Sequence, residues 1–189
     1  MPDFPPHGFS NEMAGRLHGA RTILANGLLD ESGAGRVTQE LLALAAASDD
    51  DVRVLFAMHG DQLDPAFSVY DVISTITPRV HMIATGRVAG AGIVAFCAAP
   101  LDDRTGLPMA RVHLHAFGAA SRGSADHLAR AADESAHQSA KARALIAEAT
   151  DLPAARIEED LQQGLWLDAR EAETYGLVSR ITMRGELGA

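Results

Sequence analysis

The stretch that most constrains the fold of this chain is residues 80–99, VHMIATGRVAGAGIVAFCAA. Its first five residues form a short apolar run, which predicts a buried strand. Glycines follow at 86, 90 and 92, and the apolar segment 93–99 after them predicts a helix. A strand that breaks at glycines and enters a helix makes a sharp elbow, whose free backbone N–H groups favour a developing negative charge. Such elbows often carry a nucleophile, but the tip here is Gly90; a tight strand–helix packing joint is the plainer interpretation.

Composition limits the class of protein. With 189 residues, 47% of them hydrophobic, the chain is long enough for one domain with a substantial core. A net charge of −9 argues against nucleic acid and against an anionic membrane as partners. The single cysteine, Cys97, excludes a disulfide framework and is expected to be a small buried hydrophobe. We find no signal-peptide pattern and no membrane-length apolar run, so we predict a soluble cytoplasmic protein.

Strand and helix patterns alternate along the chain. Strands are predicted at 21–29, 52–58, 110–115 and 177–181, and helices at 37–47, 64–76, 124–150, 153–163 and 168–175. We also predict a turn at Asn26-Gly27, glycines 33 and 35 ahead of the first helix, and a polar turn at 100–109. Repeated β-α units predict an α/β fold with parallel strand pairing. Residues 1–20 are expected to form an N-terminal arm or loop, and 21–189 a single domain.

Three stretches in a fixed order carry a family resemblance. They are VRVLFAMHGDQLDPAFSVYDVISTITP from Val52, TGRVAGAG with LPMARVHLH downstream, and LWLDAREAETYGLVSRI near the C-terminus. From about Arg21 to Ile181 the chain resembles the proteolytic subunit of the Clp protease, a member of the crotonase-like group. The resemblance implies a crotonase-like ββα spiral with a protruding long handle helix at 124–150. It also implies self-association into rings, a heptamer or stacked heptamers, joined through that helix.

The same resemblance implies a degenerate catalytic triad. The family has a nucleophilic serine at the position of Gly90, a base at His115 and an orienting aspartate at Gly164. Without a hydroxyl at 90, His115 has nothing to activate and no acyl-enzyme can form. The family's oxyanion loop corresponds here to His59-Gly60-Asp61, where the Asp61 carboxylate opposes stabilisation of an oxyanion. We therefore predict a Clp-protease-like subunit without serine peptidase activity, which acts as an assembly, regulatory or ligand-binding oligomer.

The alternative is a repurposed crotonase-type enzyme. It would use His115 with Asp61 and His59 as acid–base groups for dehydration, isomerisation, cyclisation or decarboxylation of a small metabolite. His113 shares a strand face with His115 and is the fourth candidate. The emptied pocket would comprise Gly60, Gly90, Ala91 and Arg87.

Each of these residues also has a plainer explanation. His115 is then an inherited histidine, Asp61 a helix cap, and His113 an ordinary strand histidine. Arg87 is either an exposed loop charge or a group that holds a carboxylate or phosphate. His113 and His115 with Asp61 also match a metal-ligand pattern, but that spacing is common by chance and the family uses no metal. We predict no metal and no cofactor.

Partners follow from the resemblance as well. Besides copies of itself, the chain is expected to meet an active Clp paralogue or a small-molecule ligand. The family docks an ATPase through aromatic pockets on the ring face. Arg53 and Leu55 stand where tyrosines are frequent, which leaves the docking of an ATPase open.

Overall fold

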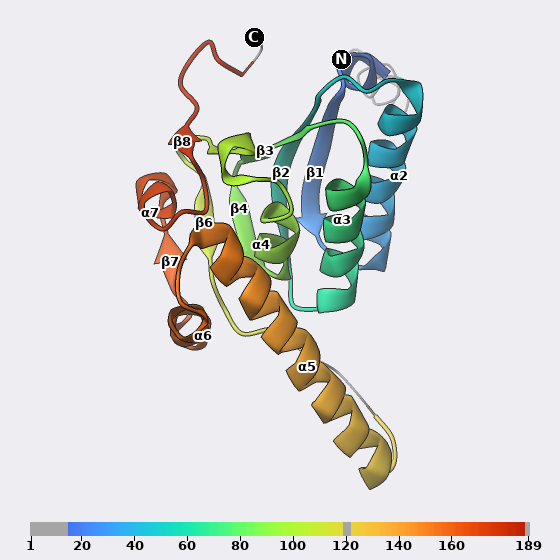
Figure 1. The fold of residues 1–189 in the computed structure, drawn as a ribbon, viewed down its shortest axis with the longest axis vertical. Coiled ribbons are helices and arrows are strands. Elements are labelled where there is room, and N and C mark those ends of the chain that lie inside the picture. Colours follow the sequence, from blue (N-terminus) through green and yellow to red (C-terminus); the bar gives the residue numbers. More distant parts are fainter. Residues whose placement is uncertain (1–14, 119–121, 188–189) are drawn as a thin grey trace, which may run out of the picture.

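The structure is a computed structural model that describes residues 15–118 and 122–187. Of the predicted N-terminal arm, residues 15–19 form a helical turn, and residues 1–14 lie outside the described residues. Figure 1 shows a sheet with helices packed beside it and one long helix that extends away from the body. A single set of buried apolar side chains runs between the sheet and the helices.

The first β-α unit differs from its prediction at the glycines. β1 (Thr22–Leu28) runs through Asn26 and Gly27 without turning, because all seven residues pair in parallel with β2 (Val52–Gly60). α2 (Glu31–Ala47) begins six residues earlier than predicted. The Asp30 side chain accepts a hydrogen bond from Gly33 N at 2.8 Å and caps the helix, so both glycines lie inside it. The predicted turn and the predicted helix start are therefore wrong.

β2 is the central strand of the fold. Its residues alternate between buried and half-exposed, with Phe56 and Met58 on the buried face. After α3 (Leu63–Thr75), β3 (Val80–Ala84) pairs with the first half of β2. The chain then leaves β3 at Thr85-Gly86 and returns as β4 (Arg87–Gly90), which pairs with the end of β2 at His59 and Gly60. α4 (Ala91–Phe96) follows directly, so the predicted elbow is present.

The rest of the chain completes the sheet. η1 (Leu101–Asp103), β5 (Arg104–Gly106), β6 (Arg111–His113), β7 (Trp166–Leu167) and β8 (Arg180–Ile181) are short elements. The strand order is β7-β6-β4-β2-β3-β5-β8, with β1 on β2. The predicted strands at 110–115 and 177–181 are thus shorter than expected, and the two-residue β7 was not predicted.

The predicted turn at 100–109 is partly a strand, because residues 104–106 pair with β3 and β8, and it carries a buried arginine. Arg104 is 1% exposed, and its guanidinium donates to the Ala149 carbonyl at the end of α5 (Ala125–Thr150) and to Cys97 Sγ. A cation at the carbonyl end of a helix is favoured by the helix dipole. Cys97 is buried, as predicted.

α5 is the predicted long helix. Ser124 caps its start by accepting from His127 N, and its buried residues, Ala142, Ile146 and Thr150, lie in its second half. The first half therefore projects from the body (Figure 1). α6 (Ala154–Gln163) and α7 (Ala169–Thr174) follow, and α7 begins with the predicted capping box of Asp168 and Glu171.

A polar cluster around the buried carboxylate of Asp160 joins α6 to the end of α7. The Asp160 carboxylate, 2% exposed, accepts from the Tyr175 hydroxyl at 2.7 Å and from Arg156 Nε at 2.8 Å. Burial first, and the Asp160 carboxylate second, raise the pKa of Tyr175 well above its usual range. The cluster fixes α6, which leads into Gly164 and β7.

We expect Tyr175→Phe to lower the free energy of unfolding by about 1 kcal/mol at neutral pH, because it removes one hydrogen bond to a buried carboxylate. The neutral phenol is favoured by folding, so this contribution is complete below about pH 10 and declines as pH rises further. Urea unfolding at neutral pH and above pH ~10 checks both points. The variant should lose less stability at high pH than the wild type, whereas Thr174→Ala should follow the wild type. If Tyr175→Phe lost as much stability at high pH as the wild type, the stabilising role of the Tyr175–Asp160 hydrogen bond would be contradicted.

Candidate functional site

Gly90 forms the tip of the elbow between β4 and α4. Its φ of 55° and ψ of −124° suit glycine, because a side chain is strained at positive φ. A Cβ at this position would lie 2.5 Å from Cε1 and 2.7 Å from Nε2 of His115, and would also collide with the Gly60 carbonyl oxygen. The His115 ring therefore lies so close to Gly90 that a side chain at position 90 would require the ring to move.

His115 is held by the backbone and faces solvent on one side. Its Nδ1 lies 3.0 Å from the Ala116 carbonyl oxygen, which can only accept, so Nδ1 donates and Nε2 is directed at Gly90. The carboxylate oxygen Asp61 Oδ1 is 3.8 Å from Nδ1, beyond hydrogen-bond distance. The two side chains are 26% and 66% exposed. The side chains of the predicted His115–Asp61 pair thus lie close together, but they are exposed to solvent and are not hydrogen-bonded to each other.

The strand register brings the other two candidate histidines beside the elbow. His59 on β2 is aligned with Ala89 on β4, and Ala89 with His113 on β6. His113 is aligned in turn with Trp166 on β7, and their rings are stacked, with centroids 4.0 Å apart and planes at 8°. The centroids of His113 and His115 are 4.8 Å apart. One row of residues across four strands therefore carries two imidazoles and the only indole of the chain.

Arg87 lies within electrostatic reach of both strand histidines. Burial is the main cause that lowers the pKa of His59, with Arg87 second; the Asp61 carboxylate opposes them. The pKa of His113 is lowered by burial, by His115 and by Arg87. Both shifts favour the neutral form of the imidazole. Of the predicted residues, His115 lies directly against Gly90, with Asp61 beside His115. His59 and His113 flank the preceding residue, Ala89, and Arg87 lies at the other end of β4. Gly60 is the partner of Gly90 on β2, and Ala91 follows Gly90 in the chain.

Two residues of this region were missed by sequence reasoning. Arg111 on β6 is aligned with Arg87 on β4, and its guanidinium carbon lies 5.4 Å from the ring centroid of Trp166. No pattern in the sequence pointed to Trp166, because β7 is too short to show alternation, or to Arg111, whose alignment with Arg87 depends on the strand register.

Gly164, where the resemblance places an orienting aspartate, lies close to His113. It ends α6 with a φ of 70°, and a Cβ there would lie 3.7 Å from Nε2 of His113. The position thus adjoins His113. Within residues 15–118 and 122–187, no group of three His, Cys, Asp or Glu side chains is placed to hold a metal ion, so the metal-ligand pattern at His113, His115 and Asp61 lacks the geometry for one.

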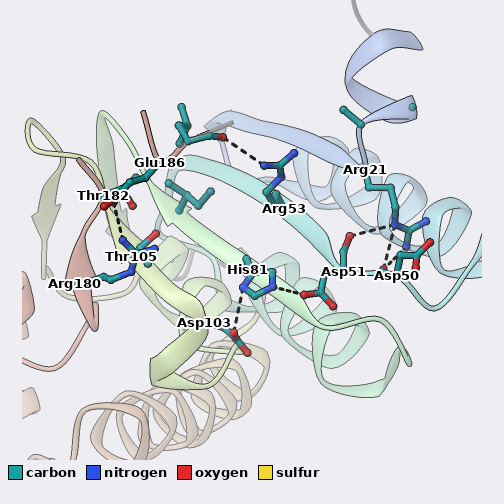
Figure 2. A pocket seen from close by; sticks show the side chains of 14 residues that line it. Arg21, Asp50, Asp51, Arg53, His81, Asp103, Thr105, Arg180, Thr182 and Glu186 are labelled. Carbon is teal, nitrogen blue, oxygen red and sulfur yellow. Dashed lines mark hydrogen bonds and ion pairs between the residues drawn. The ribbon is translucent and has the colours of Figure 1, made fainter. Parts of the chain in front are cut away.

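A cavity of about 620 Å³ lies toward the amino end of β2, away from the elbow (Figure 2). Its charged lining includes Arg53 from β2, His81 from the neighbouring β3, and Arg180 from β8, which is separated from β3 by β5. Arg53, one of the two positions where the family frequently has tyrosine, therefore contributes a guanidinium to this surface. The lining differs from the aromatic docking pocket that the resemblance implied.

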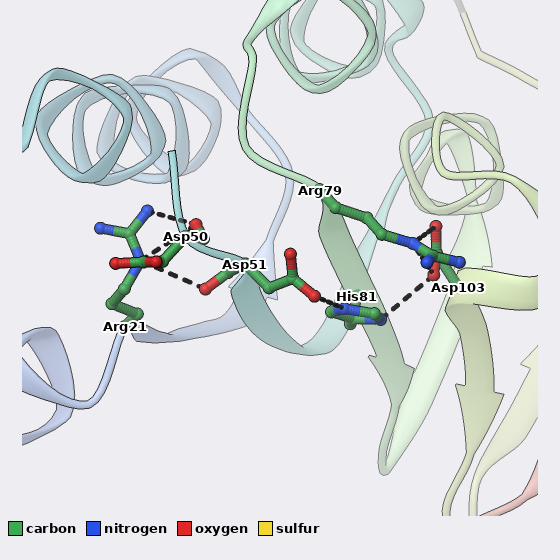
Figure 3. Close-up of polar contacts among 6 residues, drawn as sticks. All are labelled: Arg21, Asp50, Asp51, Arg79, His81 and Asp103. Carbon is green, nitrogen blue, oxygen red and sulfur yellow. Dashed lines mark hydrogen bonds and ion pairs between the residues drawn. The ribbon is translucent and has the colours of Figure 1, made fainter. Parts of the chain in front are cut away.

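One wall of this cavity is a chain of ion pairs (Figure 3). His81 lies between two carboxylates, with Nε2 2.7 Å from Asp51 and Nδ1 3.2 Å from Asp103. Asp103, whose side chain is 2% exposed, also receives Arg79 Nε at 2.7 Å. Nearby, Arg21 donates to the carbonyls of Ser48 and Asp50 at the end of α2. Each of these side chains is thus held by a neighbouring group of the protein, which indicates a structural role for this wall.

In the part of the chain that the structure describes, no helix is long and apolar enough to cross a membrane.

Comparisons with known proteins place the chain in a family. The family described as Clp protease matches residues 7–185. The ATP-dependent Clp protease proteolytic subunit 3 of Rhizobium etli is 38% identical over 170 residues, which cover 90% of this chain and 88% of that protein. Subunit 2 of Pseudomonas aeruginosa is 34% identical over 161 residues, 85% of this chain and 80% of that one.

A solved structure agrees with these sequence matches. A ClpP1 mutant from Listeria monocytogenes is similar with a TM-score of 0.82 at 28% identity, covering 94% of this chain and 99% of the other. The predicted α/β fold of the Clp-protease type is therefore confirmed. This chain belongs to the Clp protease family.

Proposed function

We propose that this chain is a Clp-family subunit that has lost serine peptidase activity and works as an assembly or ligand-binding subunit. One observation carries the proposal: the His115 ring lies against Gly90, in the space that a nucleophilic side chain would need. A hydroxyl oxygen cannot be supplied from the backbone, so the first step of acyl transfer has no nucleophile. The relatives named above are proteolytic subunits, so the loss is a departure from them.

Two further features of the site support the same conclusion. Gly164 offers no carboxylate, and its position adjoins His113. Asp61 places an exposed carboxylate beside His115, where it opposes the charge of an oxyanion. An acid–base enzyme built on His115, Asp61 and His59 is less well supported, because the His115–Asp61 pair is open to solvent and separated by 3.8 Å.

The projecting half of α5 supports self-association. A helix whose first half stands away from the body, with small side chains along it, offers a surface for a second copy. We propose ring assembly through this helix, either with copies of itself or with an active Clp paralogue as the second subunit. The charged lining around Arg53 argues against an apolar docking contact with a Clp ATPase.

The test is peptide hydrolysis by the purified wild-type chain. We expect no turnover of fluorogenic peptides and no labelling by a fluorophosphonate, because residue 90 has no oxygen to react. A proteolytic subunit from the family, assayed in parallel, shows that the substrates and the probe are competent. Turnover that disappears in His115→Ala would overturn the proposal.

A further inference from the structure

The face of β4 and β6 beside the elbow carries two aligned arginines. Arg87 and Arg111 are Cα partners in the parallel β4–β6 pair, and both are exposed. Like charges directly opposite on neighbouring strands destabilise a sheet unless something compensates them. Within the described residues neither guanidinium has an ion pair with a carboxylate; the recorded contact of Arg111 is the Trp166 ring.

The surroundings of this pair are also poor in negative charge. His59 and His113 flank Ala89, two residues along the same strand face from Arg87. Asp168 comes directly after β7, but its carboxylate accepts hydrogen bonds from the backbone amides of Arg170 and Glu171 at the start of α7. Asp61, the acid that acts on His59, lies on the His115 side of the row. The cluster is therefore cationic in a chain whose net charge is −9.

We infer that Arg87 and Arg111, with the imidazoles of His59 and His113 beside them, form a binding site for a phosphate group. Two guanidinium forks match the charge of a phosphate dianion, and each can donate two parallel hydrogen bonds to its oxygens. Neutral imidazoles can supply further N–H donors. The exposed Trp166, 44% accessible, lies on the Arg111 side and gives an aromatic substituent of a phosphate monoester a surface to contact.

This inference deepens the proposed function, because it names the ligand class of a site without a nucleophile. Trp166 is the only tryptophan of the chain, so its fluorescence reports on this face alone. The probes are inorganic phosphate and phenyl phosphate, titrated at about pH 7.5, where phosphate is mostly a dianion. Sodium chloride at equal ionic strength corrects for screening.

We expect saturable changes in Trp166 fluorescence with phosphate, and tighter binding of phenyl phosphate if the ligand is an aromatic monoester. Equal affinities would assign the site to phosphate itself. Arg87→Gln should weaken binding about tenfold or more, through loss of a charge-assisted fork. Arg184→Gln, an exposed arginine outside this region, is the matched control and should bind as the wild type.

Two outcomes would overturn the inference. One is a fluorescence change no larger than that with sodium chloride, confirmed by an unchanged phosphorus NMR linewidth. The other is equal weakening by Arg87→Gln and Arg184→Gln, which would indicate diffuse attraction. Neither result bears on the peptidase assay, and peptidase activity in the wild type would remove the proposed function while leaving the phosphate titration interpretable.

Discussion

We expect Gly90→Ser to remain without peptidase activity, with turnover at least about 10⁴-fold below that of an active Clp proteolytic subunit. The serine Cβ would lie 2.7 Å from His115 Nε2, too close for the Oγ between them to form a working hydrogen bond. The imidazole can swing away, but the Gly60 carbonyl oxygen also blocks the Cβ, and it belongs to the backbone of β2. A hydroxyl alone therefore does not restore the site.

Adding Gly164→Asp should not rescue this variant. A side chain at 164 starts beside His113 Nε2, so the new carboxylate would pair with His113. His115 Nδ1 meanwhile stays bonded to the Ala116 carbonyl, with Asp61 at 3.8 Å. Asp61 also keeps its negative charge beside the place where an oxyanion would form. Each of these obstacles is independent of the missing serine.

The measurement is fluorogenic peptide turnover together with fluorophosphonate labelling of residue 90 by mass spectrometry. Gly86→Ser is the matched control, because Gly86 also has a positive φ of 53° and its nearest atom to a Cβ is Ala57 Cβ at 3.7 Å. Gly86→Ser places a serine beside the other end of β4, where its Cβ would not collide with a neighbouring residue. Hydrolysis by Gly90→Ser that vanishes when His115→Ala is added would contradict the expectation.

The elbow could be predicted because its signals are local. Glycines at 86, 90 and 92 between apolar runs mark a turn in any context, and the capping box at Asp168 is equally local. The prediction of where the first helix begins was wrong, because it treated glycine as a helix breaker. Gly33 and Gly35 lie inside α2, because the Asp30 cap and the packing of the helix on β1 and β2 outweigh their low helix propensity.

The candidate site could be predicted only as a set of residues. Alternation placed His113 and His115 on one face, the glycine pattern marked Gly90 as the tip of the elbow, and the family resemblance added His59 and Asp61. The row from His59 through Ala89 to Trp166 depends on the register of four strands, which a single sequence does not encode locally. For the same reason Arg111 was not recognised as the neighbour of Arg87. The proximity of Gly164 to His113 likewise depends on where α6 ends in space.

We expect Gly92→Ala to lower the free energy of unfolding by about 3 kcal/mol. Gly92 lies in α4, where the helix touches β2 so closely that a methyl group would collide with the Met58 carbonyl oxygen and lie 3.0 Å from its carbon. Both partners are backbone, so neither can rotate away. Relief requires α4 to move off β2, which would open the buried core around Phe96 and shift Gly90, two residues earlier.

Two glycines of α2 provide the comparison within the same protein. At Gly33 a methyl group would collide with the Leu28 carbonyl oxygen and lie 3.0 Å from Met58 Cε, so Gly33→Ala should also destabilise, by about 2 kcal/mol. At Gly35 nothing lies within 4 Å, and Gly35→Ala should stabilise by up to about 1 kcal/mol through higher helix propensity. Urea unfolding of the three variants measures the differences. If Gly92→Ala behaved like Gly35→Ala, the close approach of α4 to β2 would be wrong. The position of the elbow, and with it the contact between His115 and Gly90, would then have to be reconsidered.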